Sequence, residues 1–166
     1  MQNNIFALII KVLTVKILNM PIDPLNWKIL QCLQDNARQS NVKIGRKVGI
    51  SSPAVSERIK KMEDAGIISS YHAIVSPFDV GYQFKAIITV RAFMGKLKPF
   101  LQKVKKYEEV LNCYRITGND NVVLEVILKN QSHLEYFIDQ LINYGETKTQ
   151  IVLSDVIKNA PINQKM

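Results

Sequence analysis

The chain has 166 residues, enough for one large domain or two small ones. Hydrophobic residues make up 47% of it and charged residues 22%, a composition that excludes an extensively disordered chain. Lysine and arginine outnumber aspartate and glutamate by 22 to 14, which gives a formal charge of +8. This excess favours an acidic partner such as nucleic acid or an anionic membrane, but it says nothing about the fold.

The start of the chain has a composition of its own. Residues 5–18, IFALIIKVLTVKIL, are apolar with two lysines among them. The stretch is shorter than the ~20 apolar residues that a membrane-spanning helix needs, and no small-residue cleavage site of a signal peptide follows it. Three interpretations remain: an extra helix at a subunit interface, a peripheral membrane anchor, or translation that begins at Met20. We favour the last, because a clear helix start follows Met20 directly.

Cap residues and apolar periodicity predict three short helices after Met20. Asp23 and Pro24 are an N-cap followed by proline at the first helical position. Serines begin the other two helices, and Gly66 is a natural C-terminal stop for the third. The predicted helices cover residues 24–35, 40–48 and 51–66.

Beyond Gly66 the apolar pattern alternates as in strands, with two helical interruptions. Extended segments are predicted at residues 71–75, 84–93, 110–117, 122–128 and 147–157, and helices after Leu97 and after a cap at Ser132. The order is three helices, a linking segment and then β-α-β-β-α-β. This predicts an α+β protein: a helix-turn-helix domain followed by a ferredoxin-like αβ-sandwich with both helices on one face of an antiparallel sheet.

The second face of that sheet is predicted to be partly apolar as well. The residues that alternate onto it are Ile87, Phe93, Val123, Ile127, Val152 and Val156. Because an apolar face of this kind needs a cover, we expect a homodimer that forms through the sheet.

The second and third helices have the spacing of a helix-turn-helix. Val55, Ile59 and Met62 fall on one face of the third helix at i, i+4 and i+7. Gly45 allows the preceding helix to approach closely. Arg58 lies at the edge of the buried face, so we expect it to pair with an acid instead of reaching outward.

The outer face of the third helix suits the major groove of DNA. Small or hydroxylated side chains near its N-terminus let the backbone approach base edges. Helix-terminal N–H groups can hold a phosphate, and the surrounding cations suit the DNA backbone. A basic amphipathic helix can also be merely a solvated face, but its pairing with the glycine turn favours DNA. The predicted DNA-binding residues are Lys43, Arg46, Lys47, Ser51, Ser52, Pro53, Ala54, Ser56, Glu57, Lys60 and Lys61.

Several motifs resemble a known family. The stretch IDPLNWKILQCLQDNARQSNVKIGRKVGISSPAVSERIKKMEDAGIISSYHAIVSPFDVGY resembles the N-terminal half of the leucine-responsive and asparagine-responsive (Lrp/AsnC) transcriptional regulators. ITGNDNVVLEV and ETKTQIVLSDVIK resemble that family's second, small-molecule-responsive domain. The likeness extends from about Ile22 to Ile162. It implies a DNA-binding regulator whose sheets form dimers, often assembled into octamers, and which responds to an amino acid or related metabolite.

The resemblance also implies an effector site between subunits. By motif it consists of the turn Gly118, Asn119, Asp120 and Asn121, with Thr147 and Thr149 on its other side. The family's usual aspartate, three residues after the glycine, is Asn121 here, and Asp120 comes one place earlier. A carboxylate at that position would suit an amino group, so the exchange bears on whether the ligand is an amino acid. The two threonines are equally well explained as strand-forming residues.

Together these features predict a cytoplasmic regulator that is not an enzyme and has no cofactor. Two alternatives stay open: an enzyme resembling the sirohaem decarboxylases, which share this architecture, and a sensor that assembles with relatives without reading DNA. Expected boundaries are an N-terminal extension at 1–20, the helix-turn-helix domain at 21–70, a hinge at 71–82 and the sensing domain at 83–166.

The cysteines and histidines carry no metal-binding pattern. Cys32 and Cys113 each lie in an apolar pattern without a CxxC or CxxH neighbour, so we expect buried free thiols. His72 and His133 stand alone, which argues against a zinc site.

Overall fold

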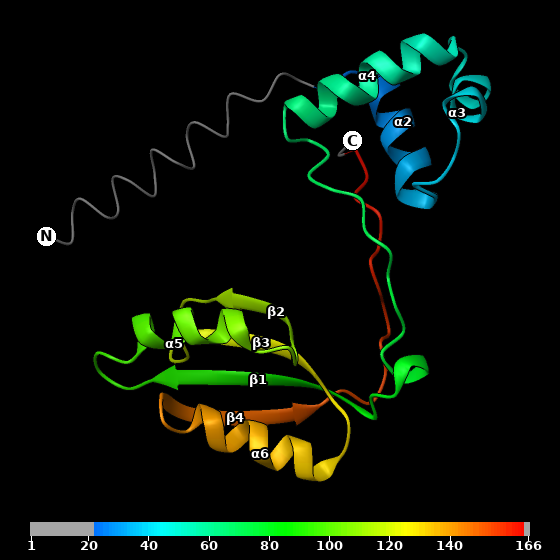
Figure 1. Ribbon diagram of the computed structural model, residues 1–166. Helices are drawn as coiled ribbons and strands as arrows, with labels where there is room; N and C mark the ends of the chain where they lie inside the picture. Colours follow the sequence, from blue (N-terminus) through cyan, green and yellow to red (C-terminus); the bar gives the residue numbers. More distant parts are fainter. Residues whose placement is uncertain (1–21, 165–166) are drawn as a thin grey trace, which may run out of the picture. The chain divides into compact units, whose positions relative to one another are not determined.

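The computed structural model describes residues 22–164 (Figure 1). Sequence predictions about residues 1–20 therefore lie outside the described part of the chain. The described residues form two compact units, which we treat separately: residues 22–72 with 159–164, and Ala73–Lys158. We refer to them as the helical unit and the sheet unit.

The helical unit contains α2 (Pro24–Asp35), α3 (Asn41–Val48) and α4 (Ser52–Asp64). Each begins at a polar side chain that accepts a backbone N–H bond three residues later, as N-caps do. Asp23 accepts from Asn26 at 2.6 Å, Ser40 from Lys43 at 3.3 Å and Ser51 from Ala54 at 3.4 Å. The three predicted helices and the caps Asp23 and Ser40 are confirmed, and of the two candidate caps for the third helix the cap is Ser51.

The core of the helical unit joins one stripe from each helix. Its buried side chains are Ile29, Leu30, Leu33, Ile44, Val55 and Met62. Gly45 has no side chain because none fits: a Cβ there would lie 2.5 Å from the carbonyl oxygen of Ile50. Gly49 ends α3 in the left-handed conformation, at φ 80°. The predicted close approach at Gly45 is confirmed.

The C-terminal segment belongs to the helical unit. The N–H of Ile162 donates to Oε1 of Gln34 at 2.7 Å, and Nε2 of Gln34 donates to the carbonyl oxygen of Ile162 at 3.0 Å. The amide of one α2 side chain thus bonds both backbone groups of a residue 128 positions later. The sequence-based boundary, which placed the whole of 83–166 in one domain, differs from this division at its C-terminal end.

The sheet unit contains four strands and two helices, with short 3-10 turns η1 (Phe78–Val80) and η2 (Val104–Lys106). Its other elements are β1 (Phe84–Ala92), α5 (Leu97–Lys103), β2 (Val110–Arg115), β3 (Val122–Leu128), α6 (Gln131–Leu141) and β4 (Gly145–Ile151). The sheet is antiparallel in the order β2-β3-β1-β4. This confirms the predicted β-α-β-β-α-β order (Figure 1).

Both helices cover the same face of the sheet. Phe100 and Val104 from α5 and η2, and Phe137 and Leu141 from α6, share one core with alternate residues of β1 and β3. The opposite face, which we call the open face, holds the intervening residues. There Lys85 pairs with Glu125 and Asp155, each at 2.8 Å.

The open face is apolar only in part. Ile87 and Val123 are half-buried and Ile127 is buried, while Phe93 is 48% exposed. The hydroxyl of Thr89 is buried without a hydrogen-bond partner in the described chain. Charged and apolar side chains are therefore mixed along the open face: Ile127 lies opposite Lys85, and Ile87 lies opposite Glu125.

Several local predictions are wrong. The last strand ends at Ile151, not at residue 157. In the register that pairs Ile151 with Ala86, β1 begins at Phe84 and so has no residue opposite position 154 or beyond, and the bond from Val152 N–H to the carbonyl oxygen of Lys85 follows the last paired residue. Val156, expected on the open face, is 91% exposed. The residues at 71–75 form no strand.

Two further predictions are corrected. The cap of α6 is Asn130, whose side chain accepts from His133 N–H at 2.8 Å, and not Ser132. Both cysteines are free thiols, but Cys113 lies exposed on the edge strand β2 and Cys32 is half-buried.

Candidate nucleic-acid interface and effector turn

The outer edge of α4 carries small, hydroxylated and charged side chains. Val55 and Met62 are fully buried beneath it. On the outside Pro53, Ser56 and Glu57 are exposed, whereas Ala54 and Ser52 are half-buried. The helical periodicity of the sequence therefore predicted correctly which residues of α4 face solvent, and these are the candidates for contact with base edges.

Arg58 has a structural role. Its guanidinium donates to Oδ2 of Asp23 at 2.6 Å and to Oδ1 of Asn26 at 2.9 Å, which ties α4 to the first turn of α2. The bond from the Asn26 N–H and the bond from Arg58 together hold the pKa of Asp23 below its usual value. The prediction that Arg58 pairs with an acid is confirmed.

Two of the predicted DNA-binding residues pair with each other. Nζ of Lys61 lies 2.7 Å from Oε1 of Glu57, one helical turn earlier. The hydrogen bond from Lys61 lowers the pKa of Glu57. Both side chains are about two-thirds exposed or more, so the pair stabilises the helix little and can open without large cost when Lys61 meets a phosphate.

The N-terminus of α4 offers fewer free amides than the sequence suggested. Pro53 has no N–H, and the Ala54 N–H donates to the Ser51 hydroxyl oxygen. Of the first three helical residues, this leaves the N–H of Ser52 for an anion, together with the two serine hydroxyls as donors.

Exposed cations lie on both helices of the turn. Lys60 and Lys61 are exposed on α4. Lys43, Arg46 and Lys47 are exposed on α3, whose buried stripe holds Ile44 and Gly45. Cations on two adjoining helices suit contact with the DNA backbone, where they add affinity without reading sequence.

The predicted effector turn is attached to the end of β1. Gly118 has φ 111°, a conformation that favours glycine. Asn121 accepts the Ala92 N–H through Oδ1 at 2.8 Å, and its own N–H donates to the carbonyl oxygen of Val90 at 2.9 Å. The Asn121 side chain is therefore a structural link between the turn and β1, which leaves its Nδ2 as a hydrogen-bond donor.

The two predicted effector threonines and the turn residue Asp120 lie on different faces of the sheet. Thr147 and Thr149 pair with Val90 and Ile88, and so lie on the helix-covered face, half-buried. Lys148, between them, points to the open face, where its Nζ lies 3.8 Å from Oδ2 of Asp120. The structure thus brings Lys148, a residue that sequence reasoning missed, to the turn. Strand alternation between the two threonines was the signal that could have found it.

Two cavities are lined by residues other than those of this turn. One, of about 580 Å³, is in the helical unit between α2 and the chain after α4, with Trp27, Tyr71 and Ile162 in its wall. Tyr71 there donates to Glu63 at 2.9 Å, and burial together with Glu63 raises the pKa of Tyr71 to about 12. The other, of about 540 Å³, is a groove between η2 and β2.

Metal and membrane features were also sought in residues 22–164. Within them no three histidine, cysteine or acidic side chains gather as a metal site. No helix in that range has the length and apolarity to cross a bilayer.

Comparisons with known proteins agree with this geometry. Residues 22–69 match winged helix-turn-helix DNA-binding domains, and residues 85–162 match the Lrp/AsnC ligand binding domain. The chain is 34% identical to the HTH-type transcriptional regulator Ptr1 of Methanocaldococcus jannaschii, over 80% of this chain and 92% of that one. It is 32% identical to the regulator LrpB of Bacillus subtilis, over 84% and 94%.

A solved structure shares the fold over most of the chain. A transcriptional regulator of Neisseria meningitidis in complex with L-methionine superposes with a TM-score of 0.80 at 29% identity, over 84% of this chain and 95% of that one. These likenesses define a helix-turn-helix transcriptional regulator with a second, ligand-binding domain. The chain belongs to the Lrp/AsnC family. Since its relatives are named transcriptional regulators, it binds DNA and is not an enzyme, and the decarboxylase alternative is not supported.

Proposed function

We propose that this regulator reads DNA through the exposed edge of α4, and that an amino acid or related metabolite bound between subunits changes that binding. The observation that supports DNA binding through α4 is that this helix has one buried face and one exposed face. Val55 and Met62 are fully buried, while Pro53, Ser56 and Glu57 stand exposed together. The reading edge is Pro53, Ala54, Ser56 and Glu57, with Ser51 and Ser52 at the start of the helix. The backbone contacts are Lys43, Arg46, Lys47, Lys60 and Lys61.

The effector is assigned to the turn Gly118–Asn121. Asp120 and Lys148 provide opposite charges 3.8 Å apart on the open face, which suit the ammonium and carboxylate of an amino acid. In this proposal Asp120 serves the amino group in place of the family's usual aspartate, and Asn121 donates to the carboxylate. The relative from N. meningitidis, solved with L-methionine, supports the ligand class.

We propose a homodimer formed by the open faces of two sheets. Half-buried Ile87 and Val123 and exposed Phe93 all gain cover there. A ligand between subunits then alters assembly or the spacing of the two α4 helices in proportion to its differential affinity for the two states. We place the protein in the cytoplasm, and four dimers would give the octamer of its family.

Two titrations test the proposal. The first measures binding of the full-length protein to a fragment of its own promoter, with Ser56→Ala and Lys60→Ala as variants. We expect Ser56→Ala to change sequence preference and Lys60→Ala to weaken binding to every sequence. Failure of the unaltered protein to bind at low salt would favour a sensor that does not read DNA.

The second titration adds the twenty amino acids to the full-length protein and measures heat and DNA affinity. Asp120→Asn should abolish the response to the active amino acid and leave DNA binding without ligand unchanged. Lys129→Gln, an exposed change of similar size in the same unit, is the matched control. An intact response in Asp120→Asn would contradict the assignment of this turn.

A further inference from the structure

The sheet unit carries a second strongly basic surface, apart from the helix-turn-helix. The eleven residues from Lys96 to Lys106, KLKPFLQKVKK, contain five lysines and no carboxylate. The five side chains are all exposed. We refer to this surface of α5 and η2 as the α5 lysine face; its lysines are Lys96, Lys98, Lys103, Lys105 and Lys106.

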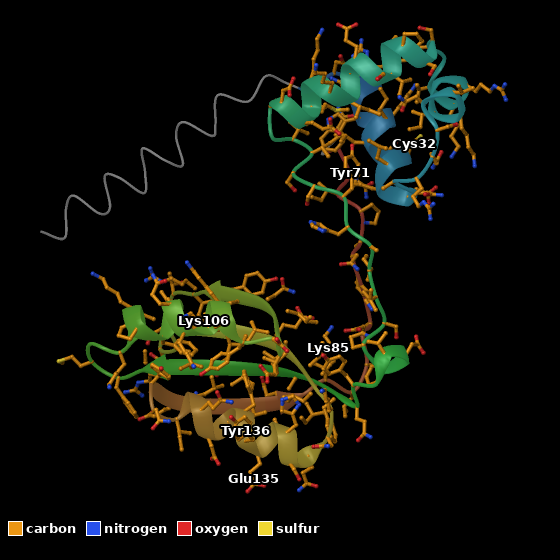
Figure 2. The ribbon with its side chains drawn as sticks, in the orientation of Figure 1. Cys32, Tyr71, Lys85, Lys106, Glu135 and Tyr136 are labelled. Carbon is orange, nitrogen blue, oxygen red and sulfur yellow. The ribbon has the colours of Figure 1, made fainter. Side chains whose placement is uncertain are left out.

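Helical spacing spreads the lysines over the whole outer side of this segment. Phe100 and Val104 are buried against the sheet, and Leu97 and Leu101 pack beside them. Because these apolar side chains face the sheet, the lysine side chains face solvent along the outer side of α5 and η2. Figure 2 shows Lys106 on this segment.

Within residues 22–164 no ion pair neutralises the surface. None of the five lysines takes part in the ion pairs of residues 22–164, which involve other cations. Two acids follow the segment. Glu108 is exposed and forms no ion pair within residues 22–164, and Oε1 of Glu109 lies 2.9 Å from Nε2 of His133 in α6. Nζ of Lys103 lies 5.4 Å from the centre of the Tyr107 ring, an interaction that leaves the positive charge in place.

The positive surface continues toward the edge of the sheet. The groove of about 540 Å³ beside η2 is bordered by Lys105 and by Arg115 of the edge strand β2. By contrast α6, the other helix on this face of the sheet, contains Glu135 and Asp139, both exposed, and no lysine or arginine. Figure 2 shows Glu135 on this helix. Charge is thus segregated between the two helices, which maintains a positive potential over α5.

We propose that the α5 lysine face contacts the phosphate backbone of DNA outside the segment that α4 reads. Five unpaired cations on a convex helical surface suit a line of phosphates, and each contact releases counterions. The outer side of α5 lacks the small and hydroxylated residues that let α4 approach base edges, so it adds affinity without sequence preference. The inference rests on DNA binding through α4, but it concerns a different surface.

A second copy of the chain is the main competing occupant. The exposed acids of α6, Glu135 and Asp139, could face the lysines of another protomer. Two carboxylates would leave most of the five lysines unpaired, and like charges would then be brought together. DNA, which supplies a continuous row of anions, satisfies the surface better.

The experiment compares two duplexes and two double variants of the full-length protein. One duplex has about 20 base pairs, enough for two half-sites one helical turn apart, and the other extends the same site to about 60 base pairs. Lys98→Gln with Lys106→Gln removes two charges from the α5 lysine face. Lys129→Gln with Lys158→Gln removes two exposed charges elsewhere in the same unit and is the matched control.

We expect the Lys98/Lys106 variant to bind the long duplex about tenfold more weakly at low salt, with a salt dependence reduced by up to about two counterions. Its binding to the short duplex, and both bindings of the control, should match the unaltered protein. An unchanged affinity for the long duplex, or an equal loss in the control, overturns the proposal. A changed oligomer size by sedimentation with unaltered DNA binding also overturns it, in favour of contact between copies. Failure of the unaltered protein on both duplexes would instead contradict recognition through α4.

Discussion

The helical unit and the sheet unit present their candidate sites in different ways. In the helical unit one helix, α4, supplies the reading edge, and its residues are close together in the sequence and exposed together. In the sheet unit the effector turn depends on β1, β3 and β4 at once, through Asn121 bonded to Ala92 and Asp120 beside Lys148. All residues of the reading edge therefore reach their positions when α4 packs onto its neighbours. The residues of the effector turn come together only when the strands pair in the correct register. The following predictions, from the largest expected effect to the smallest, test how independent the helix edge is.

Gly45 should be the most sensitive position of the helical unit. Gly45→Ala places a Cβ 2.5 Å from the carbonyl oxygen of Ile50, so α3 and α4 must separate. We expect the free energy of unfolding of this unit to fall by about 1–3 kcal/mol, as in other overpacked sites, and DNA binding to be lost. Thermal unfolding followed by circular dichroism, and titration with a promoter fragment, measure the two effects.

The matched control is the other glycine of the turn. Gly49 has φ 80° but open space around its Cα, so Gly49→Asn should cost less than about 1 kcal/mol and retain DNA binding. If both variants behaved alike, the tight contact at Gly45 would not be what positions α4.

Lysines and small residues of α4 should affect binding in different ways. Lys60→Ala and Lys61→Ala should weaken binding to specific and random DNA alike, each lowering the salt dependence by about one counterion. Ser56→Ala or Glu57→Ala should change the ratio between sequences, by about 1–3 kcal/mol for a group that contacts a base edge. Binding to a set of single-base variants of the operator gives both quantities.

The ion pair between Glu57 and Lys61 adds a second expected effect of the Glu57→Ala change. Loss of Glu57 also frees Lys61 and removes a negative charge from the surface, so Glu57→Ala should additionally raise affinity for random DNA. Equal losses on specific and random DNA in all four variants would mean that the assignment of faces on α4 is wrong.

Local patterns explain what could be predicted from the sequence. The caps at Asp23 and Ser40, the buried stripe of Val55 and Met62, and the structural role of Arg58 all follow from helical spacing over a few residues. Strand limits depend on partners far along the chain. The alternation continues in the sequence to residue 157, but β1 begins at Phe84 and has no residue to pair with positions beyond 153. For the same reason the return of Ile162 to Gln34 carries no local signal. Strand alternation places Lys148 on the open face, but its contact with Asp120 also depends on how the turn before β3 lies beside β4.

Asp23 links the start of α2 to α4, and its two roles can be separated. Asp23→Asn keeps an N-cap but loses the charge that pairs with Arg58, whereas Asp23→Ala loses both. We expect about 0.2–1 kcal/mol of destabilisation for the first change, as for a partly exposed ion pair, and about 1 kcal/mol more for the second. Urea unfolding at pH 7 measures both.

The effect of Asp23→Asn should also depend on pH. The pKa of Asp23 is lowered in the folded protein from its ordinary value of 3.8, so the folded state binds its proton less readily than the unfolded state. The stabilisation is therefore fully present above that ordinary value and is lost as the pH falls through the lowered pKa. The difference between Asp23→Asn and the unaltered protein should be constant above about pH 5 and shrink in acid. A difference that grew in acid would contradict the pairing.

The smallest effect is expected where the C-terminal segment meets α2. Gln34→Ala removes both bonds to Ile162, while Gln34→Glu keeps an acceptor for the Ile162 N–H and loses the donor to its carbonyl oxygen. Because these bonds are exposed, each should contribute less than about 1 kcal/mol. Amide hydrogen exchange at Ile162 should therefore be fastest in Gln34→Ala and intermediate in Gln34→Glu, with exchange in the buried part of α4 unchanged. Equal protection in all three proteins would mean that the segment is held by other contacts, and that α2 supports α4 without it.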